Sequence, residues 1–306
     1  AAQVSRTAVW KAVTALRADG YEIRGITRLG YALASDTDRL TAAGIGACLS
    51  PALREKISIV SFETLDSTNN EAKRRLAAGG LEPEQVLLIT GEEQTAGRGR
   101  MGRSFYSPRG TGIYMSFVFA SSTSLADAVG ITGAAAVAVV RAVRRIAGKE
   151  AQIKWVNDVF LDGKKICGIL TEAAVGLETG TLNYMVLGAG INVYLPTDGF
   201  PEEIQSIAGS VLEHSCPEAK NRLVGEFLNR FWDFYAHPEC RAYLEDYRAR
   251  SLAIGRNVTV LSAGQKISAY AYGIDDDFRL LVRYENGDTE ALSYGEIRIQ
   301  LAESAP

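Results

Sequence analysis

The stretch QTAGRGRMGRSF, residues 94–105, interleaves three arginines with three glycines. It lies between two apolar runs of strand character, 86–89 and 113–119, and therefore predicts a loop that joins two strands. From residue 94 to residue 126 there are four arginines and no acidic residue. Glycines let a backbone close on a ligand, and guanidinium groups bind carboxylate and phosphate bidentately. We therefore expect an anion-binding loop in preference to a solvated basic loop.

Two nucleotide-binding motifs are excluded for this loop. Residues 97–102 match G-x-G-x-x-G formally, but a dinucleotide-binding motif must follow a strand tightly and open a helix. Here the glycines come well after Ile89 and lead into another strand-like run. No G-x-x-x-x-G-K-[ST] occurs, which excludes a P-loop. Phe105 still offers a ring on which a base could stack.

Outward from the loop, apolar strand-like runs alternate with helical patterns. Strands are predicted at 57–60, 86–89, 113–119 and 185–188, and helices at 69–76, 130–146 and 219–235. This alternation predicts an α/β (α+β) domain with a mixed sheet and helices.

A second motif, KWVND at residues 154–158, precedes a predicted hairpin. Asp162-Gly163 is a turn signal between two apolar runs. Lys154, Asn157 and Asp158 should then lie near one strand end, with Lys165 at the start of the returning strand. Such a set could serve nucleotide chemistry. Taken alone, it is better explained as a polar surface hairpin.

A third motif, Asp66-Ser67-Thr68-Asn69, precedes a helical pattern. In isolation it predicts only a helix N-cap. The alternative is a row of small hydrogen-bonding groups for a polar ligand.

The two ends of the chain differ in character. Ser5 can cap a helix over the following dozen residues, and two short strands around Gly25 and Gly30 follow. This layout is typical of a recognition helix with its wing, although the residues alone favour an ordinary amphipathic helix with a solvated basic face. A winged helix needs earlier helices, so we expect an N-terminally truncated winged-helix remnant. From about residue 251, short strands and an Asn286-Gly287 type I′ turn signal predict a small SH3-like β-barrel.

Composition sets limits on function. The 306 residues include 33 basic and 36 acidic side chains, a net charge of −3, yet residues 1–34 carry five basic and two acidic ones. This asymmetry favours a nucleic-acid-binding end. Four cysteines without a C-x-x-C pair and only two histidines exclude a disulfide framework, a zinc ribbon and a multi-histidine metal site. No signal peptide or long apolar run occurs, which predicts a soluble protein.

Taken together, the motifs at 66–69, 94–105 and 154–168 resemble the biotin–protein ligase family, in particular its bifunctional members, the biotin operon repressors. The resemblance spans nearly the whole chain. It implies three parts: a winged-helix segment with its linker at 1–40, a biotin- and ATP-binding catalytic domain at 41–248, and an SH3-like domain at 249–306.

The resemblance also implies a role for individual residues. Catalytic roles fall to Lys165, Arg100 and Arg98, and contact with Mg²⁺ to Asp158. The residues that would bind biotin or ATP are Ser67, Thr68, Asn69, Gln94, Gly97, Arg98, Gly99, Arg100, Arg103, Phe105, Lys154, Asn157, Lys165, Gly168 and Asn192. The residues that would bind DNA are Ser5, Arg6, Thr7, Lys11, Arg24 and Arg28.

The implied activity joins biotin to ATP as biotinyl-5′-AMP and then transfers biotin to a lysine of a biotin carboxyl carrier protein. The implied cofactors are biotin, ATP and Mg²⁺. A cytoplasmic homodimer that represses biotin genes and binds operator DNA, but no membrane, is expected. Three departures from the family pattern, Val156, Phe105 and Met101, leave the charged groups of the chemistry in place.

Two other functions would fit parts of the same pattern. A lipoate–protein ligase or octanoyltransferase would have a similar fold, but the arginine-rich loop and the fused N-terminal segment argue against it. A DNA-binding regulator with an inactive, enzyme-like sensor domain is disfavoured because Lys165, Asn157 and the three loop arginines are retained.

Overall fold

The structure is a computed structural model that describes residues 5–18, 23–27, 29–33, 38–79, 81, 85–120, 128–175, 182–237, 242–262, 265–293 and 296–299. Its helices are α1 (Arg6–Ala18), α2 (Ala42–Cys48), α3 (Pro51–Arg54), α4 (Thr68–Ala77), α5 (Ala128–Ala147), α6 (Glu202–Gln205), α7 (Ala219–Ala236) and α8 (Ala242–Ala249), with a 3-10 turn at Arg100–Gly102. The strands of the first two sheets are β1 (Ile23–Ile26), β2 (Gly30–Leu33), β3 (Ile57–Phe62), β4 (Val86–Gly91), β5 (Gly112–Ala120), β6 (Gln152–Lys154), β7 (Asp158–Leu161), β8 (Lys164–Val175) and β9 (Leu182–Asn192). The C-terminal strands are β10 (Arg256–Ser262), β11 (Gln265–Ile274), β12 (Leu280–Tyr284), β13 (Thr289–Leu292) and β14 (Glu296–Ile299).

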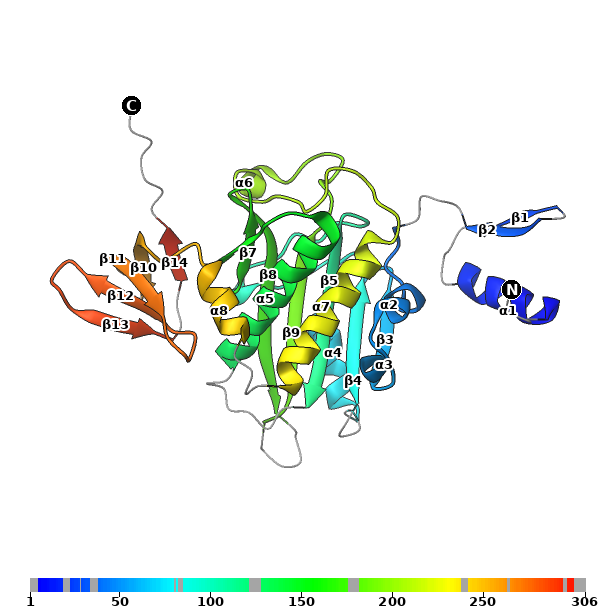
Figure 1. The fold of residues 1–306 in the computed structure, drawn as a ribbon, viewed down its shortest axis with the longest axis horizontal. Coiled ribbons are helices and arrows are strands. Elements are labelled where there is room, and N and C mark those ends of the chain that lie inside the picture. The colour runs from blue at the N-terminus through cyan, green and yellow to red at the C-terminus, as the bar shows by residue number, and fades with distance from the viewer. Residues whose placement is uncertain are drawn as a thin grey trace.

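A seven-stranded mixed sheet forms the centre of the molecule, in the order β3-β4-β5-β9-β8-β7-β6. Only β3 and β4 run parallel, and the other neighbours are antiparallel. Helices α5 and α7 cover one face and α4 covers the other (Figure 1). The fold class expected from the sequence is thus confirmed, including the four predicted strands and the three predicted helices.

Coverage on both faces explains why β4 is apolar throughout. Leu88 belongs to the core under α5 and α7, whereas Leu87 and Ile89 pack with Ala72 of α4. All six residues of β4 are buried. A strand covered on both faces reads as a continuous apolar run rather than an alternating one. The strand therefore holds the loop that follows it in a fixed position.

A buried ion pair ties the first residues of this domain to the end of β4. Lys220 of α7 is 2% exposed, and its Nζ lies 3.1 Å from Glu92 Oε2. The other oxygen of Glu92 accepts from Leu40 N at 2.7 Å. Asp38 accepts from Lys220 N at 2.9 Å. Residues 38–41 are therefore fastened beside the strand that leads into the arginine–glycine loop.

The C-terminal unit is a five-stranded antiparallel sheet in the order β13-β12-β11-β10-β14, which confirms the expected all-β end. The type I′ turn predicted at Asn286-Gly287 is wrong. Only Gly287 has a positive φ, +91°, and its N–H donates to Tyr284 O at 3.0 Å. A turn followed by a left-handed glycine is the three-residue form of a hairpin. The hairpin is present, but its loop is one residue longer than predicted.

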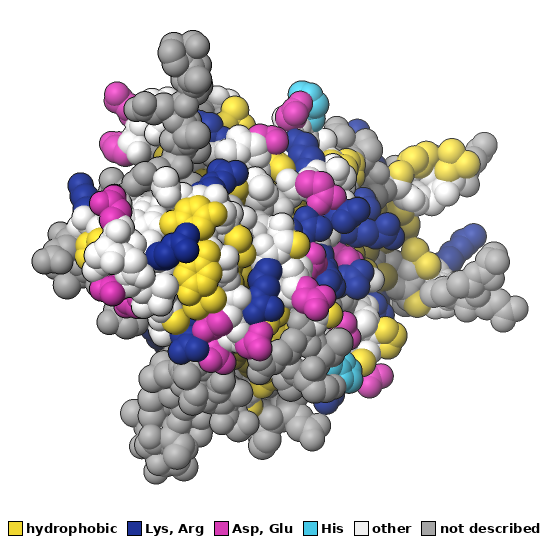
Figure 2. Space-filling model, turned by 60° about the vertical axis from the view of Figure 1, so that its left-hand side comes forward, with side chains coloured by type: hydrophobic (Ala, Val, Ile, Leu, Met, Phe, Trp, Pro, Cys, Tyr) yellow, Lys and Arg dark blue, Asp and Glu magenta, His cyan; other side chains and the backbone are white. Residues whose placement is uncertain are grey.

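Figure 2 views the molecule from the side of this sheet and shows hydrophobic side chains at the surface beside lysine and arginine. The exposed hydrophobic residues on β11 are Ile267, Tyr270 and Tyr272. The guanidinium carbon of Arg283 on β12 lies 5.6 Å from the Tyr270 ring centroid. This outer face is therefore partly aromatic.

Phe278 fastens the C-terminal sheet to the central domain. Its ring stacks on Tyr243 at 5.7 Å and meets Tyr247 edge-on at 5.2 Å, both on α8. The backbone oxygen of Phe278 accepts from Trp155 Nε1 at 2.8 Å. Trp155 belongs to the second sequence motif and is 4% exposed, so that motif also has a structural role.

Replacing Trp155 with Phe should lower the free energy of unfolding by about 1–3 kcal/mol, because a buried carbonyl loses its donor. Urea unfolding measures the change. Trp10→Phe is the matched control, because Trp10 is 57% exposed on α1. Equal stability of the two variants would show that the Trp155–Phe278 contact does not hold the units together.

At the N-terminus, α1 is followed by the antiparallel hairpin β1–β2, as the sequence predicts. Ser5 caps the helix by accepting from Ala8 N at 3.2 Å. Arg17, in the last turn, donates to Ile23 O at 2.6 Å and so holds the hairpin to the helix. Figure 1 shows this segment apart from the central sheet.

Candidate active site

The three sequence motifs converge on one cavity of about 270 Å³ above the central sheet. Of the predicted ligand-binding, catalytic and metal residues, those that line it are Ser67, Thr68, Asn69, Gln94, Arg98, Gly99, Arg100, Arg103, Phe105, Lys154, Asn157, Asp158, Lys165 and Gly168. The same cavity takes Ile207 from the segment after α6 and Ile297 from β14. Its walls therefore come from both the central domain and the C-terminal sheet.

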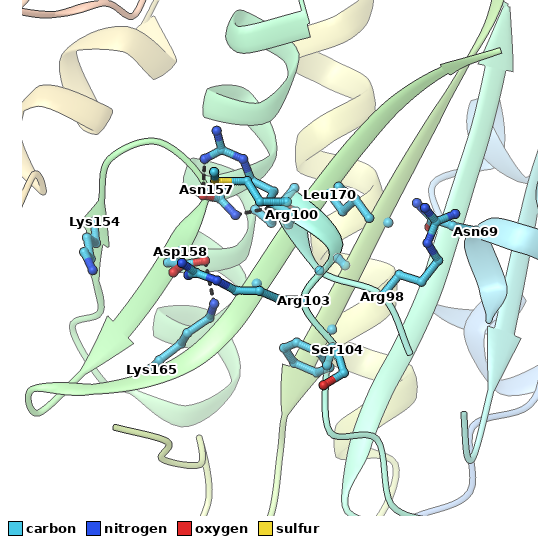
Figure 3. Close-up of a pocket in the computed structure, with 18 of the residues that line it drawn as sticks. Asn69, Arg98, Arg100, Arg103, Ser104, Lys154, Asn157, Asp158, Lys165 and Leu170 are labelled. Carbon is cyan, nitrogen blue, oxygen red and sulfur yellow. Dashed lines mark hydrogen bonds and ion pairs between the residues drawn. The ribbon is translucent and has the colours of Figure 1, made fainter. Parts of the chain in front are cut away.

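The arginines of the 97–103 loop spread across the cavity (Figure 3). Arg100 Nη1 donates to Asn157 Oδ1 at 2.8 Å, on the hairpin side. Asn157 is itself fixed, because its Nδ2 donates to Ile169 O at 2.9 Å. Arg98 lies on the opposite side, where it donates to Asn70 Oδ1 at 3.0 Å. The loop thus presents cations to both ends of the cavity.

Lys165 and Asp158 face each other across the β7–β8 hairpin, with Nζ and Oδ1 2.7 Å apart. The predicted turn at Asp162-Gly163 is confirmed, with φ of +50° and +73°. The segment after α6 supports the strand, since Lys165 N donates to Ile207 O at 2.7 Å. Lys165 therefore enters the cavity from a rigid element.

The neighbouring lysine, Lys164, points away from the cavity. Lys164 Nζ donates to Ser206 O at 2.6 Å and does not line the cavity. Adjacent residues of a strand point to opposite faces. Lys165 therefore belongs to the site, whereas Lys164 belongs to the surface.

At the other end of the cavity, residues 67–69 begin α4. Ser67 occupies the N-cap position, but its side chain makes no capping hydrogen bond. Thr68 N donates to Gln94 Oε1 at 2.9 Å, and Gln94 Nε2 donates to Ser107 Oγ at 2.9 Å. The helix-cap interpretation is therefore incomplete: Thr68 is bonded to Gln94, and residues 67–69 all line the cavity.

Asn69 is 4% exposed and bonded on both sides of its amide. Its Nδ2 donates to Glu172 Oε2 at 2.8 Å, and its Oδ1 accepts from Ser116 Oγ at 2.5 Å. Burial raises the pKa of Glu172, but hydrogen bonds from Lys73 and Asn69 outweigh that effect and lower the pKa overall. Glu172 is therefore held as a carboxylate.

The floor of the cavity is glycine on β9. A Cβ at Gly190 would lie 2.4 Å from the Phe105 ring, and a Cβ at Gly188 would lie 2.2 Å from Asn69 Oδ1. Contacts this short mean that a side chain at either position would force Phe105 or Asn69 to move. Phe105 and Asn69 therefore lie directly on the sheet backbone.

Gly190→Ala should lower the free energy of unfolding by about 1–3 kcal/mol, because the methyl group must displace Phe105. Gly46→Ala in α2 is the control: its Cβ would meet nothing within 4 Å, and alanine in a helix is favourable. Chemical denaturation of both variants tests this. If both are as stable as the wild-type chain, the close packing of Phe105 is wrong.

Two predicted ligand residues do not line the cavity. Asn192 donates through Nδ2 to Gly209 O at 3.1 Å and so supports the strand segment beside Lys165. Gly97 is buried, and a Cβ there would lie 2.4 Å from Phe105 O. Both residues shape the site from outside the cavity.

Sequence reasoning missed other residues of the site, among them Glu172 and Ser116. The signal for Glu172 was strand alternation: Gly168, Leu170 and Glu172 share one face of β8. Ile207 and Ile297 carried no comparable signal, because they reach the cavity from segments distant in sequence.

No group of three His, Cys, Asp or Glu side chains suited to a metal occurs among the described residues. Mg²⁺ is commonly held by one or two carboxylates together with substrate phosphates. Asp158 is one such carboxylate, with 21% of its side chain exposed. The donor set thus fits a phosphate-bound Mg²⁺ rather than a metal held by protein alone.

The predicted DNA-binding residues lie on the N-terminal segment. Arg6, Thr7 and Lys11 are exposed on α1, and Arg24 is exposed on β1. Ser5 is the helix cap described above, and Arg28 lies outside the described residues. In the part of the chain that the structure describes, no helix is both long and apolar enough to cross a membrane.

The cavity has a glycine floor on a mixed sheet, a cationic loop over it, and a small antiparallel sheet at one side. These features define a ligand-binding α/β protein equipped for anionic substrates. Residues 61–192 match the biotin/lipoate A/B protein ligase family, and residues 253–299 match the biotin protein ligase C-terminal domain. The chain belongs to the biotin protein ligase family.

Named relatives and solved structures agree with this assignment. The bifunctional ligase/repressor BirA of Bacillus spizizenii is 33% identical over 290 residues, which cover 92% of this chain and 86% of the relative. The biotin–[acetyl-CoA-carboxylase] ligase of Mycobacterium tuberculosis is 35% identical over 244 residues, 76% of this chain and 85% of the relative. The Aquifex aeolicus biotin protein ligase in complex with biotin and ATP has a similar fold, with a TM-score of 0.61 at 23% identity over 79% of this chain and 98% of that one.

Proposed function

We propose that this chain is an ATP-dependent biotin–protein ligase. It activates biotin as biotinyl-5′-AMP and transfers biotin to a lysine of a biotin carboxyl carrier protein. The observation that carries the proposal is the convergence of Arg98, Arg100 and Lys165 with the hydrogen-bonding groups at 67–69 in one cavity. The names of the relatives, ligases and ligase/repressors, support it.

In the first step, a carboxylate oxygen of biotin attacks the α-phosphorus of ATP, and the bond to pyrophosphate breaks. Both reactants are anions, so positive charge must offset their repulsion as they approach. Lys165 enters from β8, and Arg100 reaches across to Asn157 at 2.8 Å. These groups hold the reacting atoms together before bond formation.

In the second step, the amine of the acceptor lysine attacks the acyl carbon and loses a proton, and AMP leaves. Until then the mixed anhydride must be kept from water. The 97–103 loop forms one wall of the cavity and is joined to the hairpin through Arg100. That loop is therefore the element that retains the adenylate.

Mg²⁺ completes the proposed cofactors. When bound it would neutralise phosphate charge, and Asp158 would supply its protein carboxylate. Lys165 Nζ lies 2.7 Å from Asp158 Oδ1, so it would add a second positive charge at the same end of the cavity.

A pyrophosphate-exchange assay tests the proposal. With biotin and MgATP, labelled pyrophosphate should enter ATP, and it should not do so when lipoate or octanoate replaces biotin. Exchange with lipoate or octanoate alone would instead support the related ligases. No exchange with any of the three acids would support a sensor domain.

A second role, biotin-dependent repression, is favoured by the exposed basic face of α1 and the hairpin beside it. Biotinyl-adenylate would order loops at the surface of a homodimer, which presents two winged helices to a palindrome. An electrophoretic shift on operator DNA, with and without biotin and ATP, tests this role. Equal binding in both states would contradict it.

The proposed division of labour follows the domain limits expected from the sequence. Residues 1–40 would contact DNA, 41–248 would carry out catalysis, and 249–306 would assist ATP or acceptor binding. We place the protein in the cytoplasm, where its carrier substrate and operator would both be found.

A further inference from the structure

We propose that Glu172 is a positioning residue for the biotin-binding end of the cavity, an inference that rests on the proposed function. Glu172 lies on β8, on the same face as the cavity-lining Gly168 and Leu170, and does not line the cavity itself. One carboxylate oxygen accepts from Asn69 Nδ2 at 2.8 Å and the other from Lys73 Nζ at 2.7 Å. With 19% of its side chain exposed, it is a partly buried charge that the adenylation chemistry does not use.

The carboxylate decides which way the Asn69 amide turns. An ionised carboxylate only accepts hydrogen bonds, so Asn69 must direct Nδ2 towards it. Asn69 Oδ1 then faces Ser116 Oγ, which is fully buried and donates to it at 2.5 Å. Because the single hydroxyl proton of Ser116 goes to Asn69, Ser116 Oγ accepts from Thr68 Oγ1, which lies 2.8 Å away. The orientation imposed at Glu172 is therefore passed to two side chains that line the cavity.

The same carboxylate joins three elements. Asn69 and Lys73 lie one turn apart on α4, so two bonds on one helix face hold the start of α4 against β8. Arg98 of the arginine–glycine loop approaches from the other side, with its Nη1 3.8 Å from Glu172 Oε1. Asn69 Oδ1 lies so close to Gly188 that a Cβ at that position would be 2.2 Å from it. Arg98 keeps its 3.0 Å hydrogen bond to Asn70, so loss of the charge should disturb mainly the biotin wall.

Glu172→Gln tests this role with an isosteric change. Glutamine keeps one acceptor but places an NH₂ group against either Asn69 or Lys73. We expect the KM for biotin to rise about tenfold, as for the loss of one charge-assisted hydrogen bond. The KM for ATP and kcat in pyrophosphate exchange should stay within about twofold. General loosening of the fold would not raise the KM for biotin while leaving the KM for ATP and kcat unchanged.

A double-mutant cycle tests whether Glu172 acts through its neighbour. If it does, Glu172→Gln combined with Asn69→Ala should have the same KM for biotin as Asn69→Ala alone. Asp246→Asn is the matched control. Asp246 is 24% exposed and pairs with Arg141 at 2.8 Å and Arg250 at 3.2 Å, outside the cavity. It should leave the KM for biotin unchanged.

The inference is overturned if Glu172→Gln leaves the KM for biotin unchanged in an active chain, if the effects of the two substitutions multiply, or if Asp246→Asn raises that KM equally. A wild-type chain that does not activate biotin would overturn the proposed function, and this inference with it. An active wild-type chain with an unaltered Glu172→Gln variant would overturn the inference alone.

Discussion

Lys165→Met should lower the rate of biotinyl-adenylate formation by about 10²–10³-fold. Lys165 enters the cavity from β8, on the strand backed by Ile207. Removing one preorganised group that stabilises developing charge typically costs about 3–4 kcal/mol. Without the ammonium group of Lys165, the repulsion between the biotin carboxylate and the α-phosphate would be only partly offset. Methionine keeps the length of the side chain, so the cavity should stay filled.

The chain offers a matched control for this experiment in the adjacent residue. Lys164→Met removes the same charge one residue away, but Lys164 donates to Ser206 O outside the cavity. Single-turnover formation of biotinyl-AMP should be close to wild-type in Lys164→Met. Equal rates in both variants would show that Lys165 has no part in the chemistry.

Arg100→Gly should release biotinyl-adenylate about 10–100 times faster than the wild-type chain does. Arg100 donates to Asn157 at 2.8 Å and so connects the loop with the hairpin that carries Lys165 and Asp158. Loss of a hydrogen bond to a charged group costs about 1.5–3 kcal/mol. The freed loop would retain the mixed anhydride less well, and escaped adenylate would label lysines of bystander proteins.

Arg109→Gly provides the comparison. Arg109 lies in the same arginine-rich stretch, but it pairs with Glu63 at 3.4 Å and Glu93 at 3.6 Å and does not line the cavity. Release of labelled adenylate after rapid dilution, and biotin on added albumin, measure the effect. Unchanged release from Arg100→Gly would rule out the closing role of the loop.

Much of the fold was readable from sequence because its longest elements are strongly patterned. The apolar runs of β4 and β5 and the alanine-rich α5 are covered on two sides, and burial on this scale leaves a clear signal. The helices α2, α3, α6 and α8 were not predicted. They have seven, four, four and eight residues, and helices this short depend on tertiary packing.

The candidate site was readable in part for a different reason. Its charged and glycine-rich motifs are local, so spacing grouped Arg98 with Arg100, and the resemblance to biotin–protein ligases joined Lys165 to them. Contributions that depend on topology were hidden: Ile207 and Ile297 reach the cavity from distant segments. The contact between Glu172 and Asn69 spans 103 positions. Asn192, expected at the nucleotide, instead bonds to Gly209, because only the fold decides which side of a strand end meets the ligand.

The most direct test is to incubate the chain with biotin, MgATP and a biotin-carrier domain, and to locate the modification by mass spectrometry. The proposed function predicts one biotin amide on one lysine of the carrier, with AMP and pyrophosphate as products and no transfer without ATP. A carrier that remains unmodified under saturating biotin and MgATP, while an established ligase modifies the same preparation, would contradict the proposed function.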